Sequence, residues 1–311
     1  FKGSEFHFEV VGDILTPEIL DFLKTVPAGM FQFEIGIQTT TESVQETIQR
    51  KQSNEKLFKT IQQLVEQDRI HFHCDLIFGL PGETLKDIQQ SLCKVIALKP
   101  HELQLGFLKF LPGAPINNLI ETHQYHYQST PPYELISHQH LSPQEVTYLK
   151  QFVDIFDRYY NSKRFRFSIH YLLEKMDPII IFNRLRDYHD AHDILMNPVS
   201  LDEYYRIFRD TFFSAATAME QDLLKLDYLY SQRSFRLPAV LQTSKHLPPV
   251  KTWEKDRKTP VIPFHHEIAI SGSQAILKAT KNPVYYAIAH SQNGDGYFRR
   301  PTVNAISVTK T

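Results

Sequence analysis

The sequence is poor in cysteine: its 311 residues include only Cys74 and Cys93. They lie far apart and form no spaced pair, which excludes the disulfide framework of a small secreted protein. Both fall within apolar-patterned segments, so we expect them to be small buried residues. So few thiols suit a reducing compartment, and we expect a cytoplasmic protein.

An excess of charge of either sign is also missing, because the net charge is only −1. No strong field therefore favours nucleic acid or a membrane surface as a partner. No apolar run approaches the roughly 20 residues needed to cross a bilayer, and no secretory signal is visible. Phosphate-binding glycine loops, nucleophile elbows and dinucleotide fingerprints are absent as well. We expect a soluble protein with a small-molecule substrate, which the sequence does not identify, and neither a nucleic-acid nor a membrane partner.

Strand and helix patterns alternate in the first third of the chain. Apolar runs predict four strands, at 6–10, 31–40, the run ending at 79, and 103–108. Between them, apolar residues three and four positions apart predict helices at 17–26, 41–49, 54–67 and 85–98. Right-handed crossovers would give a parallel sheet with its polar strand ends on one rim.

The most informative segment is Asp75-Leu76-Ile77-Phe78-Gly79-Leu80-Pro81-Gly82-Glu83-Thr84. An apolar run ends there in a glycine-proline turn, and a polar helix start follows. This pattern predicts a buried strand that leads into a tight loop, where barrel enzymes bind ligands. The two glycines would let a flat ligand lie against the backbone, while Pro81 fixes the exit of the loop. An ordinary strand-to-helix turn would give a similar pattern.

Three ordered motifs resemble the later half of a radical S-adenosylmethionine (SAM) barrel: Phe-Glu-Val, Glu-Ile-Gly-Ile-Gln-Thr, and the segment from Asp75 to Thr84. The most similar branch contains oxygen-independent coproporphyrinogen oxidases and cobalamin-associated, cyclase-like enzymes. The resemblance covers about residues 5–116. It implies an α/β fold, a partial parallel (β/α) barrel, followed by a mainly α-helical accessory domain.

The resemblance also implies roles for individual residues. Glu9 would hold the methionyl amino group of SAM, and Arg50 its carboxylate. Gln38 and Asp75 would hold the ribose hydroxyls. These side chains complement those parts of SAM in charge and hydrogen bonding. The adenine would pack against the stretch that contains Ile77, Gly79 and Gly82.

Each assignment has a local alternative. Arg50 could be a solvated cation at a helix end, and Gln38 could cap the next helix. Glu9 and Asp75 could be polar groups of a barrel interior, paired with His7 or His73.

The cluster motif of the resembled family, Cys-x3-Cys-x2-Cys, is missing. We therefore expect a C-terminal fragment whose cluster loop and first two barrel strands lie in an absent N-terminal half, its partner. In the intact enzyme, the resemblance implies a [4Fe-4S] cluster, with ligands outside this chain, that delivers an electron to SAM and releases a 5′-deoxyadenosyl radical. A cobalamin-binding domain in the absent part is a further expectation. This piece alone is not expected to reduce SAM.

Two other classes of function stay open. His71, His73 and Asp75 alternate along one strand and share a face, so they could bind a divalent metal as in a barrel hydrolase. The chain could also be a catalytically incomplete interaction or scaffold fragment, because the cluster cysteines are absent.

Glycine and prolines interrupt the α/β alternation near residues 110–115. We divide the chain into a partial barrel (1–116), a helical accessory domain (117–236) and a C-terminal extension of irregular structure and short strands (237–311). In the second part the pattern predicts one long helix over 201–229. In the third, repeated prolines disfavour long helices, and short strands are expected at 261–270 and 284–289.

Overall fold

The computed structural model describes residues 4–232, 237–242, 261–271, 274–289 and 302–306. The chain forms two compact units. Unit 1 contains residues 1–154 and 177–179, and unit 2 contains 155–176 and 180–311. The three-part division at residues 117 and 237 stays a prediction, since much of 237–311 lies outside the described residues.

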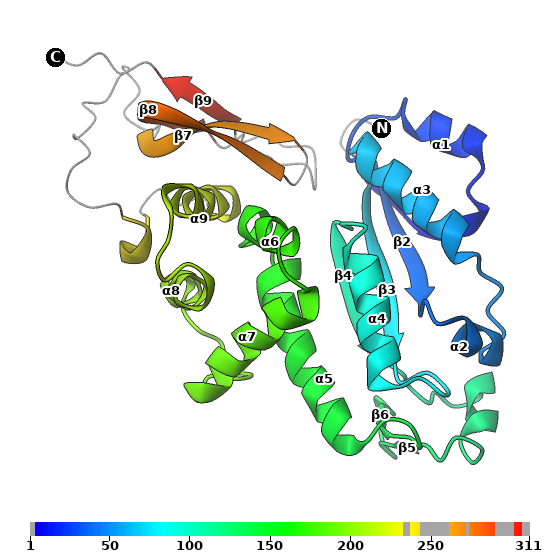
Figure 1. Ribbon diagram of the computed structural model, residues 1–311. Helices are drawn as coiled ribbons and strands as arrows, with labels where there is room; N and C mark the ends of the chain where they lie inside the picture. Colours follow the sequence, from blue (N-terminus) through cyan, green and yellow to red (C-terminus); the bar gives the residue numbers. More distant parts are fainter. Residues whose placement is uncertain (1–3, 233–236, 243–260, 272–273, 290–301, 307–311) are drawn as a thin grey trace. The chain divides into compact units, whose positions relative to one another are not determined.

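Unit 1 is built on four parallel strands in the order β1-β2-β3-β4. Strands β2, β3 and β4 are labelled side by side in Figure 1. Its elements are β1 (Phe6–Val10), the 3-10 turn η1 (Gly12–Ile14), α1 (Pro17–Leu23), β2 (Phe31–Gln38), α2 (Glu42–Thr47), α3 (Asn54–Gln67), β3 (His71–Phe78), α4 (Leu85–Ile96), β4 (Glu102–Phe107), η2 (Pro115–Leu119), β5 (His126–Tyr127), β6 (Leu135–Ser137) and most of α5 (Pro143–Phe156). The four predicted strands and the four helices between them are present, and the predicted α/β fold class is confirmed.

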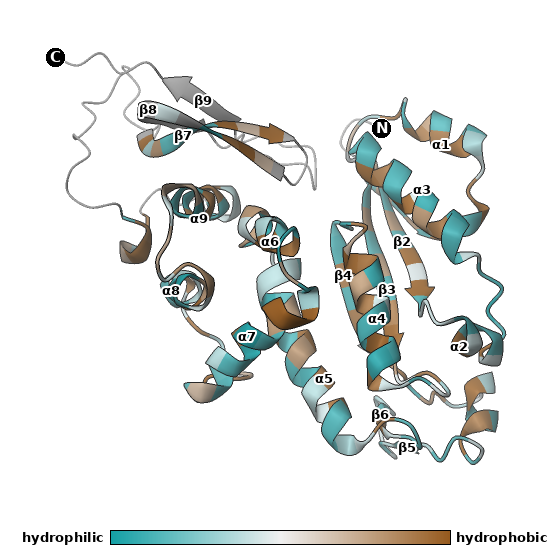
Figure 2. Ribbon diagram, viewed as in Figure 1, coloured by the Kyte–Doolittle hydropathy of each residue, from teal (hydrophilic) through white to brown (hydrophobic). Residues whose placement is uncertain are grey.

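The two faces of this sheet differ in chemistry because side chains alternate along each strand. One face is apolar and buried; it carries Phe33, Ile35, Phe72, Cys74 and Leu103, which the strand register aligns with one another. Helices α3 and α4 are amphipathic, and Figure 2 shows apolar and polar residues alternating along them. Their buried residues include Ile61 and Leu92. The hydrophobic core therefore lies on the apolar face, which leaves the opposite face for polar groups.

Helix α4 begins at a well-formed cap directly after the glycine-proline turn. The Thr84 side chain accepts a hydrogen bond from the backbone N–H of Asp87, whose carboxylate in turn accepts one from the Thr84 N–H at 2.9 Å. Such a reciprocal cap satisfies donors that the first helical turn leaves unpaired. It fixes where the loop after β3 ends.

Unit 2 combines helices with an antiparallel sheet of order β7-β8-β9. Its elements are the end of α5, a π-helical turn η3 (Asp157–Asn161), α6 (Arg166–Leu173), α7 (Pro178–Ala191), α8 (Leu201–Phe212), α9 (Ala218–Ser231), η4 (Ala239–Leu241), β7 (Val261–Ser271), β8 (Gln274–Ala289) and β9 (Thr302–Ile306). Aromatic rings fill its core, and those of Phe165 and Phe208 stack with centroids 4.3 Å apart. The accessory part is thus mainly helical, as predicted.

Two sequence predictions for unit 2 are wrong. Residues 201–229 form two helices because Thr217 caps α9: its side chain accepts from the Glu220 N–H, and the Glu220 carboxylate accepts from the Thr217 N–H. The second strand begins at Gln274 and not at residue 284, because it pairs with β7 as far as Ser271. In the part of the chain that the structure describes, no helix has both the length and the apolar character to cross a membrane.

Candidate functional site

The face of the four-stranded sheet opposite the core is lined mainly by polar side chains and glycines; we call it the polar face. Its positions are His7 and Glu9 on β1, Gln32, Glu34 and Gly36 on β2, His71, His73, Asp75 and Ile77 on β3, and Glu102, Gln104 and Gly106 on β4. The parallel register aligns Glu9, Glu34 and His73 side by side, and Gly36 lies beside Asp75. The sheet thus gathers ionisable groups from neighbouring strands on one surface.

Gln38 and Arg50 meet this surface at Gly36. Pairing between β2 and β3 shifts after Gly36, and Gln38 adopts a positive φ of 67°. Its Nε2 lies only 2.6 Å from where a Cβ on Gly36 would stand. The Arg50 guanidinium donates to the Gly36 carbonyl through Nη2 and to Gln52 Oε1 through Nε. Because Gly36 is aligned with Asp75, the structure brings Gln38, Arg50 and Asp75 to one end of the polar face.

Two acceptor atoms at this end have no hydrogen-bond partner among the described residues. They are Gln38 Oε1 and Asp75 Oδ1, and both are buried. Burial raises the pKa of Asp75 to about 6; Glu34, through its charge and a side-chain hydrogen bond, and the charge of Glu9 add to the rise, and His73 opposes it. Buried acceptors without donors are uncommon in proteins and call for an explanation.

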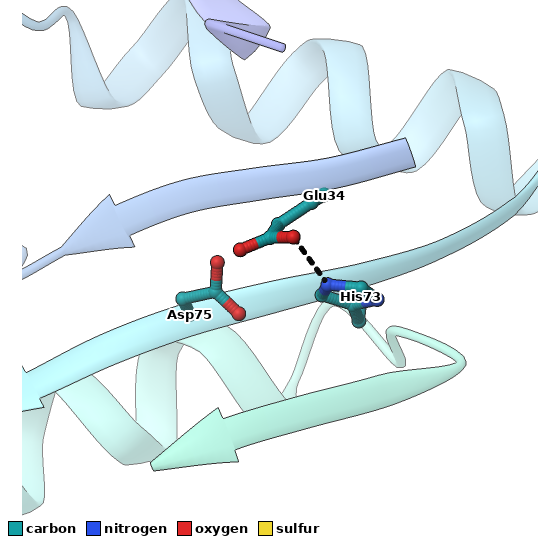
Figure 3. Close-up of side chains that lie close together, drawn as sticks. All are labelled: Glu34, His73 and Asp75. Atoms are coloured by element: carbon teal, nitrogen blue, oxygen red, sulfur yellow. Dashed lines mark ion pairs between the residues drawn. The ribbon is translucent and has the colours of Figure 1, made fainter. Parts of the chain in front are cut away.

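Glu34 lies at the centre of an ionisable cluster that the sequence analysis missed. Its Oε2 is 3.4 Å from His73 Nε2 and 3.3 Å from His7 Nε2. Burial would raise the pKa of Glu34, but hydrogen bonding and charge from His73, with help from His7, hold it below its usual value. Figure 3 shows Glu34 on β2 turned toward His73 and Asp75 on β3. Glu34 could have been found from the sequence, because it alternates with Gly36 and Gln38 along one strand and so shares their face.

Glu9 occupies the β1 position aligned with Glu34, and its side chain is exposed. Its charge adds to the raised pKa of Asp75. The four polar residues predicted from the sequence therefore belong to one face of the sheet and its edge.

Ile77 is half-buried on the polar face, where it is aligned with Gly106. Among the described residues other than its chain neighbours, only the Leu76 carbonyl oxygen lies within 4 Å of a Cβ built on Gly106. Ile77 therefore presents an apolar side chain beside an open stretch of backbone, which suits contact with a flat ring.

The two loop glycines differ in their surroundings. Both have positive φ, 84° at Gly79 and 82° at Gly82. A Cβ on Gly79 would lie 2.0 Å from Leu135 Cδ2, so the space beside it is already filled by the chain. Apart from its chain neighbours, no atom of the described residues lies within 4 Å of a Cβ on Gly82, which leaves that side of the loop open.

Glu83 ties together the loops that follow β2 and β3, a role that the sequence analysis did not assign. It is buried, and its carboxyl accepts hydrogen bonds from the Thr39 hydroxyl at 3.0 Å and from the N–H groups of Gly79 and Leu80 at 3.1 and 3.3 Å. Burial raises the pKa of Glu83 to about 8. Because Thr39 follows Gln38, Glu83 holds the Gln38 backbone against the glycine loop. The sequence signal for this role of Glu83 was its position, a carboxyl directly after a glycine turn.

Neither cysteine is suited to hold an iron–sulfur cluster. Cys74 is buried on the apolar face, where burial raises its pKa far above the ordinary value. Cys93 is only half-buried, which corrects the expectation that both are buried; burial and nearby Asp177 raise its pKa to about 11. Cluster ligands are thiolates, and both environments favour the neutral thiol.

His71 does not join the group of possible metal ligands around Asp75. Its Nε2 lies 3.9 Å from Glu102 Oε1, and its side chain is buried. Among the described residues, the group whose ligand atoms lie close together is Glu34, His73 and Asp75.

Two family models match the chain. Residues 1–92 match the model described as Radical SAM superfamily, and residues 121–272 match one described as a protein of unknown function, DUF4080. The resemblance of the N-terminal part to the radical SAM superfamily is therefore confirmed.

The chain is also similar to individual proteins. The chain is 30% identical over 123 residues to the heme chaperone HemW of Bacillus subtilis, covering 40% of this chain and 32% of the relative. It is 31% identical over 98 residues to the cobalamin-dependent radical SAM methyltransferase TokK of Streptomyces tokunonensis, covering 31% and 14%. A solved structure of coproporphyrinogen III oxidase (HemN) from Escherichia coli, a radical SAM enzyme, aligns with 21% identity over 48% of this chain and 38% of that one, with a TM-score of 0.32. The chain spans a third or less of the length of the two curated relatives.

Proposed function

We propose that unit 1 is the SAM-binding part of a radical SAM iron–sulfur enzyme. In this proposal Glu9 binds the methionyl amino group, Arg50 the methionyl carboxylate, and Gln38 with Asp75 the ribose hydroxyls. Ile77, Gly79 and Gly82 belong to the strand and loop proposed for the adenine; Ile77 and Gly82 would contact it, because Leu135 fills the space beside Gly79. The family match of residues 1–92 supports the class of ligand.

The observation that carries the proposal is the pair of unpaired buried acceptors, Gln38 Oε1 and Asp75 Oδ1. A ribose presents two neighbouring hydroxyl groups, each of which can donate a hydrogen bond. Leaving a buried acceptor unpaired costs about 1–3 kcal/mol, so a diol that satisfies both would bind favourably. These residues therefore fit this part of SAM.

The other parts of the site agree in charge and shape. Arg50 is held in place by the Gly36 carbonyl and by Gln52, so its cation is positioned before a ligand arrives. Glu9 supplies an exposed carboxylate on the same face. Ile77 beside Gly106 provides an apolar surface for a purine.

The iron–sulfur cluster does not fit the residues of this chain. Two separated cysteines cannot replace three closely spaced ligands, and both are held as neutral thiols. We infer that the cluster is bound by an N-terminal part of the protein. When bound, the cluster would supply the electron for SAM cleavage. The residues described above bind and orient SAM, an arrangement that lowers the barrier through positioning. No residue of this chain is assigned to cobalamin.

The proposal is tested by measuring SAM binding to the purified 311-residue chain by isothermal titration calorimetry. We expect Gln38→Ala and Asp75→Ala each to weaken binding by about tenfold or more, which corresponds to about 1.4 kcal/mol. Glu55→Gln, on the exposed surface of α3, is the control and should bind like the wild type. Unchanged affinity in both site variants would remove the assignments. A folded chain without measurable affinity would favour the interaction-fragment alternative.

A further inference from the structure

We propose that Glu34, His73 and Asp75 bind a first-row divalent transition-metal ion on the polar face. One imidazole nitrogen and two carboxylate oxygens would be the protein ligands, and solvent or substrate would complete the coordination. The site shares Asp75 with the proposed SAM site but involves neither Gln38 nor Arg50.

The geometry places the three ligand atoms around a common point. The ligand atoms of Glu34, His73 and Asp75 all lie within 4.8 Å of one another (Figure 3). Nitrogen and oxygen ligands bind zinc at about 2.0–2.2 Å. The ligand atoms around one bound ion therefore lie closer to one another than the 4.8 Å limit found here. Small side-chain rotations would therefore close the site.

The backbone holds these groups in register. Glu34 and His73 are aligned neighbours on β2 and β3, and Asp75 lies two residues further along β3 on the same face. Ligands on paired strands are positioned more precisely than ligands on loops. Gln38 and Arg50 lie over Gly36, beside Asp75, and bound the site at this end.

The donor set selects the class of ion. An imidazole combined with carboxylates suits Zn²⁺, Fe²⁺ or Mn²⁺, whereas Ca²⁺ and Mg²⁺ prefer oxygen ligands alone. A thiolate is not available, because Cys74 lies between His73 and Asp75 in the chain and occupies the apolar face. Zn²⁺ is therefore the most suitable probe.

The surrounding charge also favours a cation. Glu9, Glu34 and Asp75 bring carboxylates from three neighbouring strands onto one face. Like charges so close repel one another, and a divalent ion would relieve the repulsion. A carboxylate has two oxygens, so Asp75 can ligate the metal through one and accept a ribose hydroxyl through the other.

A simple ion pair between Glu34 and His73 is the competing explanation, and metal titration separates the two. The chelator-treated 311-residue chain is titrated with ZnCl2 by calorimetry, with MgCl2 as the comparison ion. We expect one tight Zn²⁺ site per chain and much weaker binding of Mg²⁺. Absence of a stoichiometric Zn²⁺ site in the folded protein would overturn the proposal.

Variants locate the site. Glu34→Gln and His73→Gln, on different strands, should each weaken Zn²⁺ binding by at least about 10–100-fold, the loss seen when even outer-shell groups are removed. His126→Gln changes an exposed histidine elsewhere and is the matched control for weak surface binding among the 15 histidines. Tight binding that survives both site variants would also overturn the proposal. Thermal unfolding of each variant verifies that it is folded.

The metal and SAM proposals fail independently. Glu34→Gln should lose Zn²⁺ affinity and retain SAM affinity, because Glu34 is not among the assigned SAM contacts. Arg50→Ala should lose SAM affinity and retain Zn²⁺ affinity. Loss of both affinities in Glu34→Gln would mean that Glu34 acts through the SAM site and not as a metal ligand.

Discussion

Replacing Glu83 by glutamine tests how the loops after β2 and β3 are joined. The buried carboxyl lies between the Thr39 hydroxyl on one side and the N–H groups of Gly79 and Leu80 on the other. Glutamine has nearly the same shape but carries no charge. Its amide oxygen can accept from the two N–H groups while its NH2 donates to the Thr39 oxygen. Glu83→Gln therefore preserves the connection and removes only the ionisation.

The expected effect depends on pH. Burial raises the folded-state pKa of Glu83 from 4.5 to about 8. Between these values Glu83 has lost its proton in the unfolded chain and keeps it in the folded chain. The contribution of Glu83 to the free energy of unfolding therefore falls as pH rises from 4.5 to 8, and it is constant above pH 8. At about 1.4 kcal/mol for each tenfold change in acidity, the loss is at most about 5 kcal/mol. The glutamine variant lacks this loss.

The assay is urea unfolding followed by circular dichroism at pH 5, 7 and 9. Relative to the wild type, Glu83→Gln should gain stability from pH 5 to pH 9. Glu83→Ala should be less stable at all three, because each of the three donors left unpaired costs about 1–3 kcal/mol. A glutamine variant that is less stable than the wild type at pH 9 would refute the reasoning, since it would show that the charged carboxylate is the favoured form.

Two further substitutions test local geometry. Gly79→Ala should destabilise unit 1 by about 2–5 kcal/mol, because a Cβ would overlap Leu135 at a positive φ. Thermal unfolding checks this against Gly82→Ala, which has a similar φ but open space and should cost only about 1–2 kcal/mol; equal losses would contradict the role of Leu135. In unit 2, buried Asp227 accepts from the N–H groups of Phe167 and Ser168 at the start of α6, at 2.7 and 3.0 Å. Asp227→Ala should lower the free energy of unfolding by about 2–3 kcal/mol, and Asp227→Asn by less; equal stability of the alanine variant and the wild type in urea would contradict this.

The sheet and its two faces were predictable because they follow from alternation along each strand. Phe72, Cys74 and Leu76 alternate with His71, His73 and Asp75, which separates an apolar face from a polar one. In each strand the apolar residues face the core, so Glu9 and Asp75, which alternate with them, share the polar face. The positions of Glu9 and Asp75 therefore required only the strand pattern and the motif resemblance.

Other features depend on contacts that a linear pattern does not contain. Gln38 reaches the polar face through an irregular pairing after Gly36 and a positive φ. The role of Glu83 depends on hydrogen bonds to two loops, and one partner, Thr39, is 44 residues away in the sequence. The division of 201–229 into α8 and α9 was missed because apolar residues continue through the break, although the Thr217 and Glu220 cap was readable.

The polar face is difficult to explain by folding alone. Burying a carboxyl such as that of Asp75 near other carboxyls disfavours its charged form and contributes no apolar packing. On the opposite face, the same strands bury aliphatic and aromatic side chains with α3 and α4, which stabilises the unit. Natural sequences depart from such consistency mainly where a ligand is bound. The unpaired acceptors of Gln38 and Asp75, together with the Glu34 and His73 cluster, are therefore better explained by groups that bind there than by the stability of the sheet.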